Sequence, residues 1–166
     1  MKAVIMLITV VCGYCIGNMF ASKLKMRRKF LEKMILLLDN FENLIRYKDM
    51  TVDELVKWAV KSNEYKELCF LQIIDEENGE FSEKWRDSLD NKQLKAFLSN
   101  EDINEISLIG VGLGKSDKQG QDAHLKLHKT LIKNKYETAL KDEQSKVRLY
   151  KKLGLLSGIG LSIIIV

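Results

Sequence analysis

Two kinds of apolar pattern divide this chain. Residues 3–21 and 153–166 are runs without a charge, whereas between them apolar residues recur at three- and four-residue steps. The nineteen residues of the first run give about 28 Å of α-helix, close to the ~30 Å hydrocarbon core of a membrane. The fourteen of the second give only about 21 Å, so it spans a bilayer when flanking lysines snorkel and the bilayer thins locally. We therefore predict a transmembrane helix at each end.

Each apolar run has an alternative interpretation. The first run is also compatible with a cleaved signal peptide. However, Lys2 is the only basic residue before it, and the small-x-small pair of a cleavage site is absent before Ser22. The second run is short enough to be a tail that docks in the bundle or lies in the membrane interface. Its Gly154-x-x-x-Gly158 step lets another membrane helix approach closely, including the helix of a second copy in an oligomer.

The first part of the middle segment predicts a long helix followed by a short one. The apolar stripe from Phe30 to Ile45 continues the first run without a break, so we expect one long amphipathic helix. Thr51 and Glu54 have the spacing of a capping box, which marks the start of the next helix.

The remainder of the middle segment also predicts helices. We expect a helix over residues 64–77 that ends at an Asn78-Gly79 turn, and another that is capped by Ser99. After Gly114 a single helix runs to the C-terminus and carries straight into the second apolar run. The sequence therefore predicts an all-α protein, in which a small cytoplasmic helical bundle is flanked by N- and C-terminal transmembrane helices.

Composition and charge support this arrangement. The chain has no proline, and its 46% of hydrophobic residues include many helix formers. Residues 30–145 carry 17 basic and 23 acidic residues, whereas residues 23–29 and 146–152 together carry nine basic residues and no acidic one. This distribution does not resemble a nucleic-acid surface. By the positive-inside rule it places the middle of the chain in the cytoplasm, which gives three predicted parts: residues 1–22, 23–152 and 153–166.

No catalytic or metal-binding pattern is complete. The stretch Gly110–Ser116 resembles a phosphate-binding loop, but Ile109 stands where the first glycine of that motif belongs and no strand precedes it. Its glycines are better explained by close approach of two helices, with Ser116 or Asp117 capping the next one. His124 and His128 lack the glutamate of the zinc-protease signature, so we interpret them as half-buried bundle positions.

The cysteines do not indicate chemistry either. Cys12 and Cys15 lie in the first apolar run, where thiols behave as small hydrophobic groups, and Cys69 has no partner in the sequence. We therefore predict no catalytic residue, no metal site and no cofactor.

As a whole the chain resembles the stage III sporulation protein AB family of endospore-forming bacteria. The resemblance covers nearly all of the chain, including the first apolar run with its basic flank and the tail from Leu153. It rests on these residues: Glu42, Ile45, Tyr47, Gly112, Gly114, Ser116, Asp117, Gln121 and His124. The glycine-aspartate-glutamine segment is also similar to the cytoplasmic domains of type II secretion F and type IV pilus platform proteins. Gly120 departs from the larger polar residue expected there.

The resemblance implies a component of the channel, or feeding tube, between mother cell and forespore. It places the chain in the mother-cell membrane around the forespore and implies no enzymatic activity. The implied partners are the secretion-type ATPase stage III sporulation protein AA, other stage III sporulation channel proteins and membrane lipid, but no nucleic acid. The candidate partner-binding residues are Gly112, Gly114, Asp117, Gln121 and His124.

Two other functions stay open at this point. One is a membrane-anchored structural or regulatory adaptor that recruits membrane proteins through its glycine-rich tail and does not couple to an ATPase. The other, a metal- or nucleotide-using enzyme, has far less support in the sequence.

Overall fold

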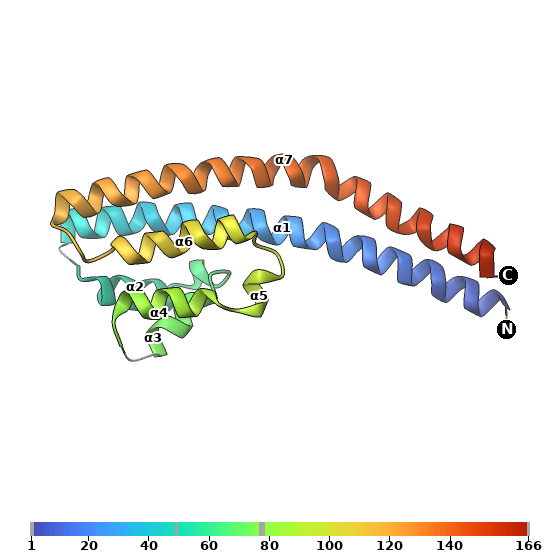
Figure 1. Cartoon of the computed structure of the whole chain (residues 1–166), viewed down its shortest axis with the longest axis horizontal. Helices are drawn as coiled ribbons and strands as arrows, with labels where there is room; N and C mark the ends of the chain where they lie inside the picture. The colour runs from blue at the N-terminus through green and yellow to red at the C-terminus, as the bar shows by residue number, and fades with distance from the viewer. Residues whose placement is uncertain (1, 49, 77–78, 166) are drawn as a thin grey trace. The chain divides into compact units, whose positions relative to one another are not determined.

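The computed structural model describes residues 2–48, 50–76 and 79–165, and over these residues it is all-helical, without a strand (Figure 1). The all-α prediction is therefore confirmed. The elements in chain order are α1 (Lys2–Lys48), α2 (Val52–Lys61), the 3-10 helix η1 (Asn63–Tyr65), α3 (Phe70–Glu76), α4 (Phe81–Leu89), α5 (Lys92–Lys95), α6 (Asn100–Gly112) and α7 (Lys118–Ile165).

The chain forms two compact units, and the long helices α1 and α7 contribute to both. The hairpin unit consists of residues 1–28 and 138–166, and the bundle unit consists of residues 29–137. Each long helix is continuous, as the unbroken apolar stripes of the sequence predict.

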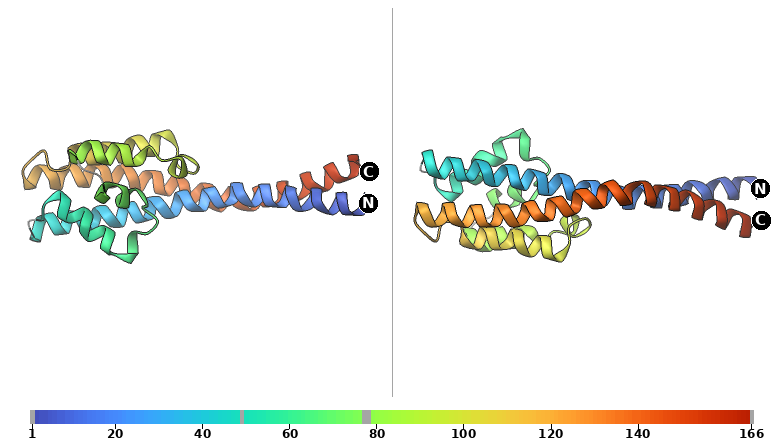
Figure 2. Two further views of the ribbon diagram at one scale, coloured as in Figure 1. Left: turned by 90° about the horizontal axis from the view of Figure 1, so that it is seen from below. Right: turned by 90° about the horizontal axis from the view of Figure 1, so that it is seen from above.

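In the hairpin unit, α1 and α7 lie antiparallel and touch through glycines. A Cβ atom added to Gly13 would lie 2.5 Å from the carbonyl oxygen of Gly154, and one added to Gly17 would lie 2.5 Å from that of Tyr150. A Cβ atom on Gly158 would lie 2.9 Å from the Cα atom of Val10. Small residues therefore bring the two backbones into direct contact. Both chain ends lie at the same end of this unit (Figure 2).

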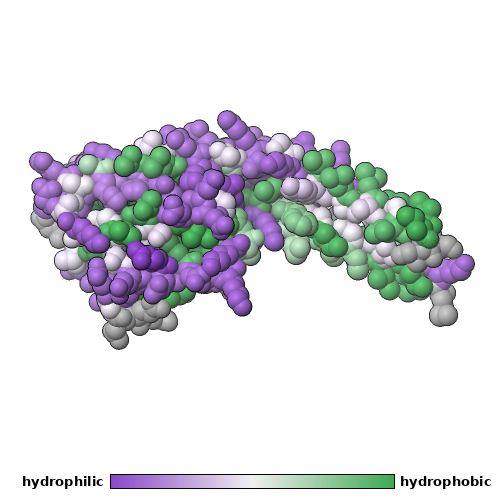
Figure 3. Space-filling view, viewed as in Figure 1, coloured by the Kyte–Doolittle hydropathy of each residue, from purple (hydrophilic) through white to green (hydrophobic). Residues whose placement is uncertain are grey.

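The outer surface of the hairpin unit is largely apolar over residues 4–20 and 153–164. Figure 3 shows apolar side chains over the part of this unit that lies next to the chain ends. Of the helices that the structure describes, α1 alone contains a segment from Val4 onward that is long and apolar enough to cross a membrane. The apolar side chains exposed on both helices include Leu7, Ile8, Val11, Ile16, Met19, Leu153, Leu156, Leu161, Ile163 and Ile164.

The bundle unit has a core to which almost every helix contributes. One stripe of α1, from Phe30 to Phe41, is fully buried, as its spacing predicts. The predicted cap residues Thr51 and Ser99 both accept hydrogen bonds from the backbone N–H three residues later, within complete capping boxes. The fully buried large side chains of the other helices include Leu55, Phe70, Leu71, Ile74, Trp85, Leu94, Ile106, Ile109, Leu125 and Ile132.

The prediction of a helix over residues 64–77 is wrong for the first half of this range. Residues Asn63–Tyr65 form a 3-10 turn, and the α-helix begins only at Phe70. The side chains of Tyr65 and Leu68 are both buried, and the Leu68 N–H donates to the Tyr65 carbonyl in a turn. Turning both side chains into the core interrupts the helix. At the far end, Gly79 has a φ of 139°, whereas Asn78 lies outside the described residues.

Candidate functional site

The five predicted partner-binding residues come together at the turn between α6 and α7. The α6 helix ends where the Leu113 N–H donates to the carbonyl of Ile109. Gly114 then takes a φ of 79°, a left-handed conformation that suits glycine, and the chain reverses into α7. Residues 114–119 are all exposed, so the turn presents a surface.

Asp117 and Gln121 close this turn with their own polar groups. The Asp117 carboxylate caps α7, because its Oδ1 atom accepts a hydrogen bond of 2.9 Å from the backbone N–H of Gly120. The Gln121 side-chain amide donates to the carbonyl of Ser116 at 3.0 Å. A Cβ atom on Gly120 would lie 2.7 Å from the Ser116 hydroxyl oxygen, which explains why a larger residue is absent there. Capping by Asp117 is thus confirmed.

His124 and His128 join α7 to α6. A Cβ atom on Gly112 would lie 2.2 Å from the His124 ring, so the histidine packs directly on the glycine. The Nε2 atom of His124 lies 3.0 Å from the carbonyl oxygen of Ile109. His128 is buried, and its Nδ1 atom lies 2.6 Å from a carboxylate oxygen of Glu105. The interpretation of both histidines as bundle positions is confirmed.

The glycine-rich stretch that begins at Gly110 allows close packing between helices. Trp85 of α4 packs on Gly110, where a Cβ atom would lie 2.1 Å from the indole ring. The indole Nε1 atom donates to the carbonyl of Ile106 at 2.8 Å. The glycines thus permit close approach, as expected. Within the part of the chain that the structure covers, no group of three His, Cys, Asp or Glu side chains has the geometry to hold a metal ion.

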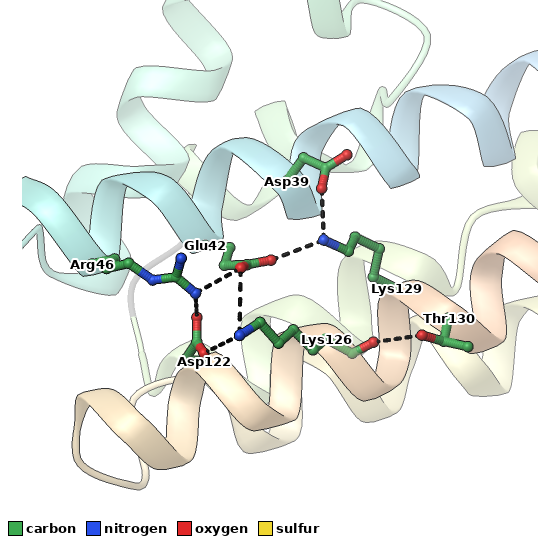
Figure 4. Close-up of polar contacts among 7 residues, drawn as sticks. All are labelled: Asp39, Glu42, Arg46, Asp122, Lys126, Lys129 and Thr130. Atoms are coloured by element: carbon green, nitrogen blue, oxygen red, sulfur yellow. Dashed lines mark hydrogen bonds and ion pairs between the residues drawn. The ribbon is translucent and has the colours of Figure 1, made fainter.

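A network of charged side chains joins α1 and α7 in the bundle unit (Figure 4). Its centre is the buried carboxylate of Glu42, which accepts a hydrogen bond of 2.8 Å from Arg46 and one of 2.9 Å from Lys129. Asp122 accepts from Arg46 at 2.5 Å and from Lys126 at 2.6 Å. Lys129 also donates to Asp39, at 2.7 Å.

The network shifts the pKa values of Asp122 and Lys129 toward their charged forms. The pKa of Asp122 is lowered, chiefly by the hydrogen bond from Lys126 and next by that from Arg46. The pKa of Lys129 is raised, first by its hydrogen bond to Asp39 and then by that to Glu42. Asp122 and Lys129 therefore both stay charged through the neutral pH range.

The comparison with known proteins gives the family of the chain. A family model described as stage III sporulation protein AB matches residues 2–166. The chain belongs to this family. No curated protein and no solved structure matches it. Membership assigns the chain a role in stage III of sporulation.

For this member of the stage III sporulation protein AB family, the charged network is not among the features predicted from the sequence. The signal that could have indicated part of it is the four-residue spacing of Glu42 and Arg46, and of Asp122 and Lys126, which suits ion pairs within each helix. The sequence did not show that the two pairs face each other across α1 and α7, because helical periodicity does not identify which helix a face meets. Glu42 was noted only as a residue of the family resemblance.

Proposed function

We propose that this chain is a membrane platform component of the channel, or feeding tube, between mother cell and forespore. In this role the hairpin unit crosses the mother-cell membrane twice and the bundle unit faces the cytoplasm. The chain is not an enzyme and takes no cofactor. It couples the secretion-type ATPase stage III sporulation protein AA to the other channel proteins, and hydrolysis by the ATPase supplies the energy.

The continuity of α1 and α7 carries this proposal. Each is a single helix that contributes residues to both units, so a force applied to the bundle is passed along backbone hydrogen bonds to the hairpin. The ion pairs of Glu42 and Asp122 hold the two helices together in the bundle unit. Family membership adds the stage of sporulation in which the chain acts.

The two-span topology is supported by the hairpin unit. The terminal part of α7 packs on α1 through Gly154 and Gly158, while its other side chains, such as Leu156 and Ile163, are exposed and apolar. An apolar outer surface on a packed pair of helices fits lipid rather than water. The nine basic residues at 23–29 and 146–152 favour a cytoplasmic position for the bundle.

The α6–α7 turn is the surface that we assign to the ATPase. The experiment replaces Asp117 by Asn, which caps a helix as well as Asp does but carries no charge. We expect Asp117→Asn to keep the melting temperature of the chain while co-purification of the ATPase and spore yield fall several-fold. Asp117→Ala should lower the melting temperature as well, because the cap is lost.

The matched control is Asp87→Asn, which removes an exposed carboxylate on α4, away from the turn sequence. It should leave ATPase binding and spore yield unchanged. If Asp117→Asn retains both properties at the level of this control, the assignment of the turn is wrong.

The alternative is a membrane-anchored adaptor without an ATPase partner. The side of α7 that does not face α1 favours this alternative. Gly154 and Gly158 already face α1, but a Cβ atom on Gly160 would meet nothing within 4 Å. Gly160→Leu therefore tests contact with another membrane protein without disturbing the hairpin. If it abolishes assembly while changes at the α6–α7 turn do not, the adaptor function is supported and the platform function is contradicted.

A further inference from the structure

The hairpin unit has few acidic side chains, and they form ion pairs with basic residues of the same unit. Its only carboxylate side chains are those of Asp142 and Glu143. Glu143 accepts a hydrogen bond of 2.6 Å from the Nε atom of Arg28. Asp142 lies 2.7 Å from Lys146 and 3.7 Å from Arg27. The internal ion pairs of this unit therefore use both of its acids.

Several basic residues next to the apolar surface, by contrast, form no ion pair with a carboxylate of this unit. Among the described residues of the hairpin unit, no ion pair involves Lys25, Arg148, Lys151 or Lys152. Arg148 and Lys152 are exposed, and Lys151 is half-buried. Both carboxylates are already held, so these basic groups are available to an external anion.

One of these basic residues, Arg148, lines a groove between α1 and α7. The groove has a volume of about 550 Å³ and is lined by Arg28, Leu140, Glu143, Gln144, Val147 and Arg148. Its lining therefore combines apolar side chains with guanidinium groups. The charge of Glu143 is compensated by Arg28, so Arg148 is the cation that gives the groove its excess positive charge.

The position of Arg148 along α7 matches the depth of lipid headgroups. Arg148 precedes Leu153, the first residue of the apolar tail, by five residues, which corresponds to about 7.5 Å of helix. The headgroup layer on each side of a bilayer is roughly 5–8 Å thick. When the tail is in the hydrocarbon core, Arg148, Lys151 and Lys152 thus lie at the level of the phosphates.

We propose that Arg148, at the membrane-facing end of this groove, and Lys151, three residues further along α7, bind the headgroup of an anionic phospholipid of the cytoplasmic leaflet. Arg148 and Lys151 bind the phosphate oxygens, and an acyl chain of the lipid follows the exposed apolar residues of α7 such as Leu156. The proposal rests on the topology of the proposed function. It adds a ligand class and a site, because a headgroup bound against both helices fixes the depth and orientation of the hairpin in the membrane.

The test measures lipid binding to the full chain in a neutral detergent by native mass spectrometry. Phosphatidylglycerol and phosphatidylcholine are titrated in turn, and the bound fraction gives a Kd for each. We expect phosphatidylglycerol to bind about thirtyfold more tightly, because Arg148 and Lys151 each contribute a factor of about five to binding of anionic lipid. Arg148→Gln with Lys151→Gln should weaken phosphatidylglycerol binding by the same factor of about thirty and leave phosphatidylcholine binding unchanged.

The matched control is Lys61→Gln with Lys66→Gln, which removes the same charge from exposed positions of the bundle unit. It should bind phosphatidylglycerol as the unaltered chain does. Equal Kd values for the two lipids, or equal loss in the control, would overturn the proposal. Displacement of phosphatidylglycerol by an equal concentration of inorganic phosphate would also overturn it, because the site would then be one for free anions.

Carbonate extraction of membranes separates this proposal from the topology on which it rests. If the unaltered chain is extracted, the two-span topology fails. If it stays in the membrane but shows no preference for phosphatidylglycerol, only the headgroup site fails.

Discussion

At the scale of single residues, the buried carboxylate of Glu42 links the two long helices within the bundle unit. It is 8% exposed, and it is held by Arg46 and Lys129 from two different helices. A carboxylate with so little access to water depends on such partners, because removing them would leave a desolvated charge. Glu42 therefore stabilises the pairing of α1 with α7, and this accounts physically for a residue that the sequence marked only by resemblance.

Replacing Glu42 by Gln tests this role. Glu42→Gln keeps the size of the side chain but weakens its hydrogen bonds to Arg46 and Lys129, and we expect the free energy of unfolding to fall by about 1–3 kcal/mol. Circular dichroism during unfolding of the full chain in detergent micelles measures the change. Glu67→Gln, at an exposed position, is the control. A Glu42→Gln variant as stable as this control would contradict the role.

Asp122 gives the bundle unit a predictable response to acid. Its pKa is lowered in the folded chain, so its contribution to stability is present above the ordinary pKa of about 3.9 and is lost as the pH falls through the folded value. Lys129 has a raised pKa, so its contribution is complete below about pH 10.4 and is lost only as the pH rises further. Neither group titrates near neutrality.

We therefore expect the melting temperature to fall more steeply between pH 5 and pH 3 (about one unit on each side of the ordinary value) in the unaltered chain than in Asp122→Asn. Thermal unfolding at a series of pH values measures the two slopes. Asp87→Asn should retain the slope of the unaltered chain. Equal slopes for the unaltered chain and Asp122→Asn would show that the ion pairs of Asp122 do not stabilise the fold.

At the scale of elements, glycines decide how closely the helices pack. Gly110 lets the ring of Trp85 of α4 contact the backbone of α6, and Gly112 lets the ring of His124 of α7 do the same. In the hairpin unit, Gly13 and Gly154 bring the backbones of α1 and α7 together. These contacts explain the glycine-rich stretch after Ile109 without any phosphate-binding role.

Adding one methyl group to Gly110 tests this packing. The new Cβ atom would lie 2.1 Å from the Trp85 ring, so we expect Gly110→Ala to lower the free energy of unfolding by about 1–3 kcal/mol or more. Gly160→Ala is the matched control, because its Cβ atom meets nothing within 4 Å. Thermal unfolding of both variants provides the comparison, and equal melting temperatures would refute close packing at Gly110.

The elements also show where sequence reasoning succeeds and where it stops. The continuity of α1 and α7 and the caps at Thr51 and Ser99 follow from local patterns, and these predictions are confirmed. The start of α3 does not follow, because the burial of Tyr65 and Leu68 depends on what the rest of the bundle leaves open. Pairing between distant segments, such as Gly13 with Gly154, has no local signal.

The candidate site also combines features that the sequence predicts with features that it does not. The sequence predicts a cap of α7 at Ser116 or Asp117, because both stand just before a long helical pattern, and the structure assigns the cap to Asp117. The seating of His124 on Gly112 becomes visible only when α6 and α7 lie side by side. Both residues thus have structural roles, so a variant that keeps the cap, Asp117→Asn, is the one that separates docking from folding.

At the scale of the whole molecule, the two units share the continuous helices α1 and α7, and the proposed function places the hairpin unit in the membrane and the bundle unit in the cytoplasm. Membership of the stage III sporulation protein AB family gives the process, and the proposed coupling to an ATPase gives the activity. The coupling requires that the bundle and the ATPase share one compartment. It also requires that both chain ends lie on the opposite side of the membrane.

Accessibility of single cysteines to a membrane-impermeant maleimide tests this arrangement most directly. The three native cysteines are replaced by serine, and one cysteine is placed in turn at Lys2, Lys66 or Ile164, which are all exposed. In intact cells that make the chain without forming a forespore, so that it lies in the outer cell membrane, the account predicts labelling at positions 2 and 164 but not at 66, which should react only after permeabilisation. Labelling at 66 in intact cells, or at 164 only after permeabilisation, would contradict the account.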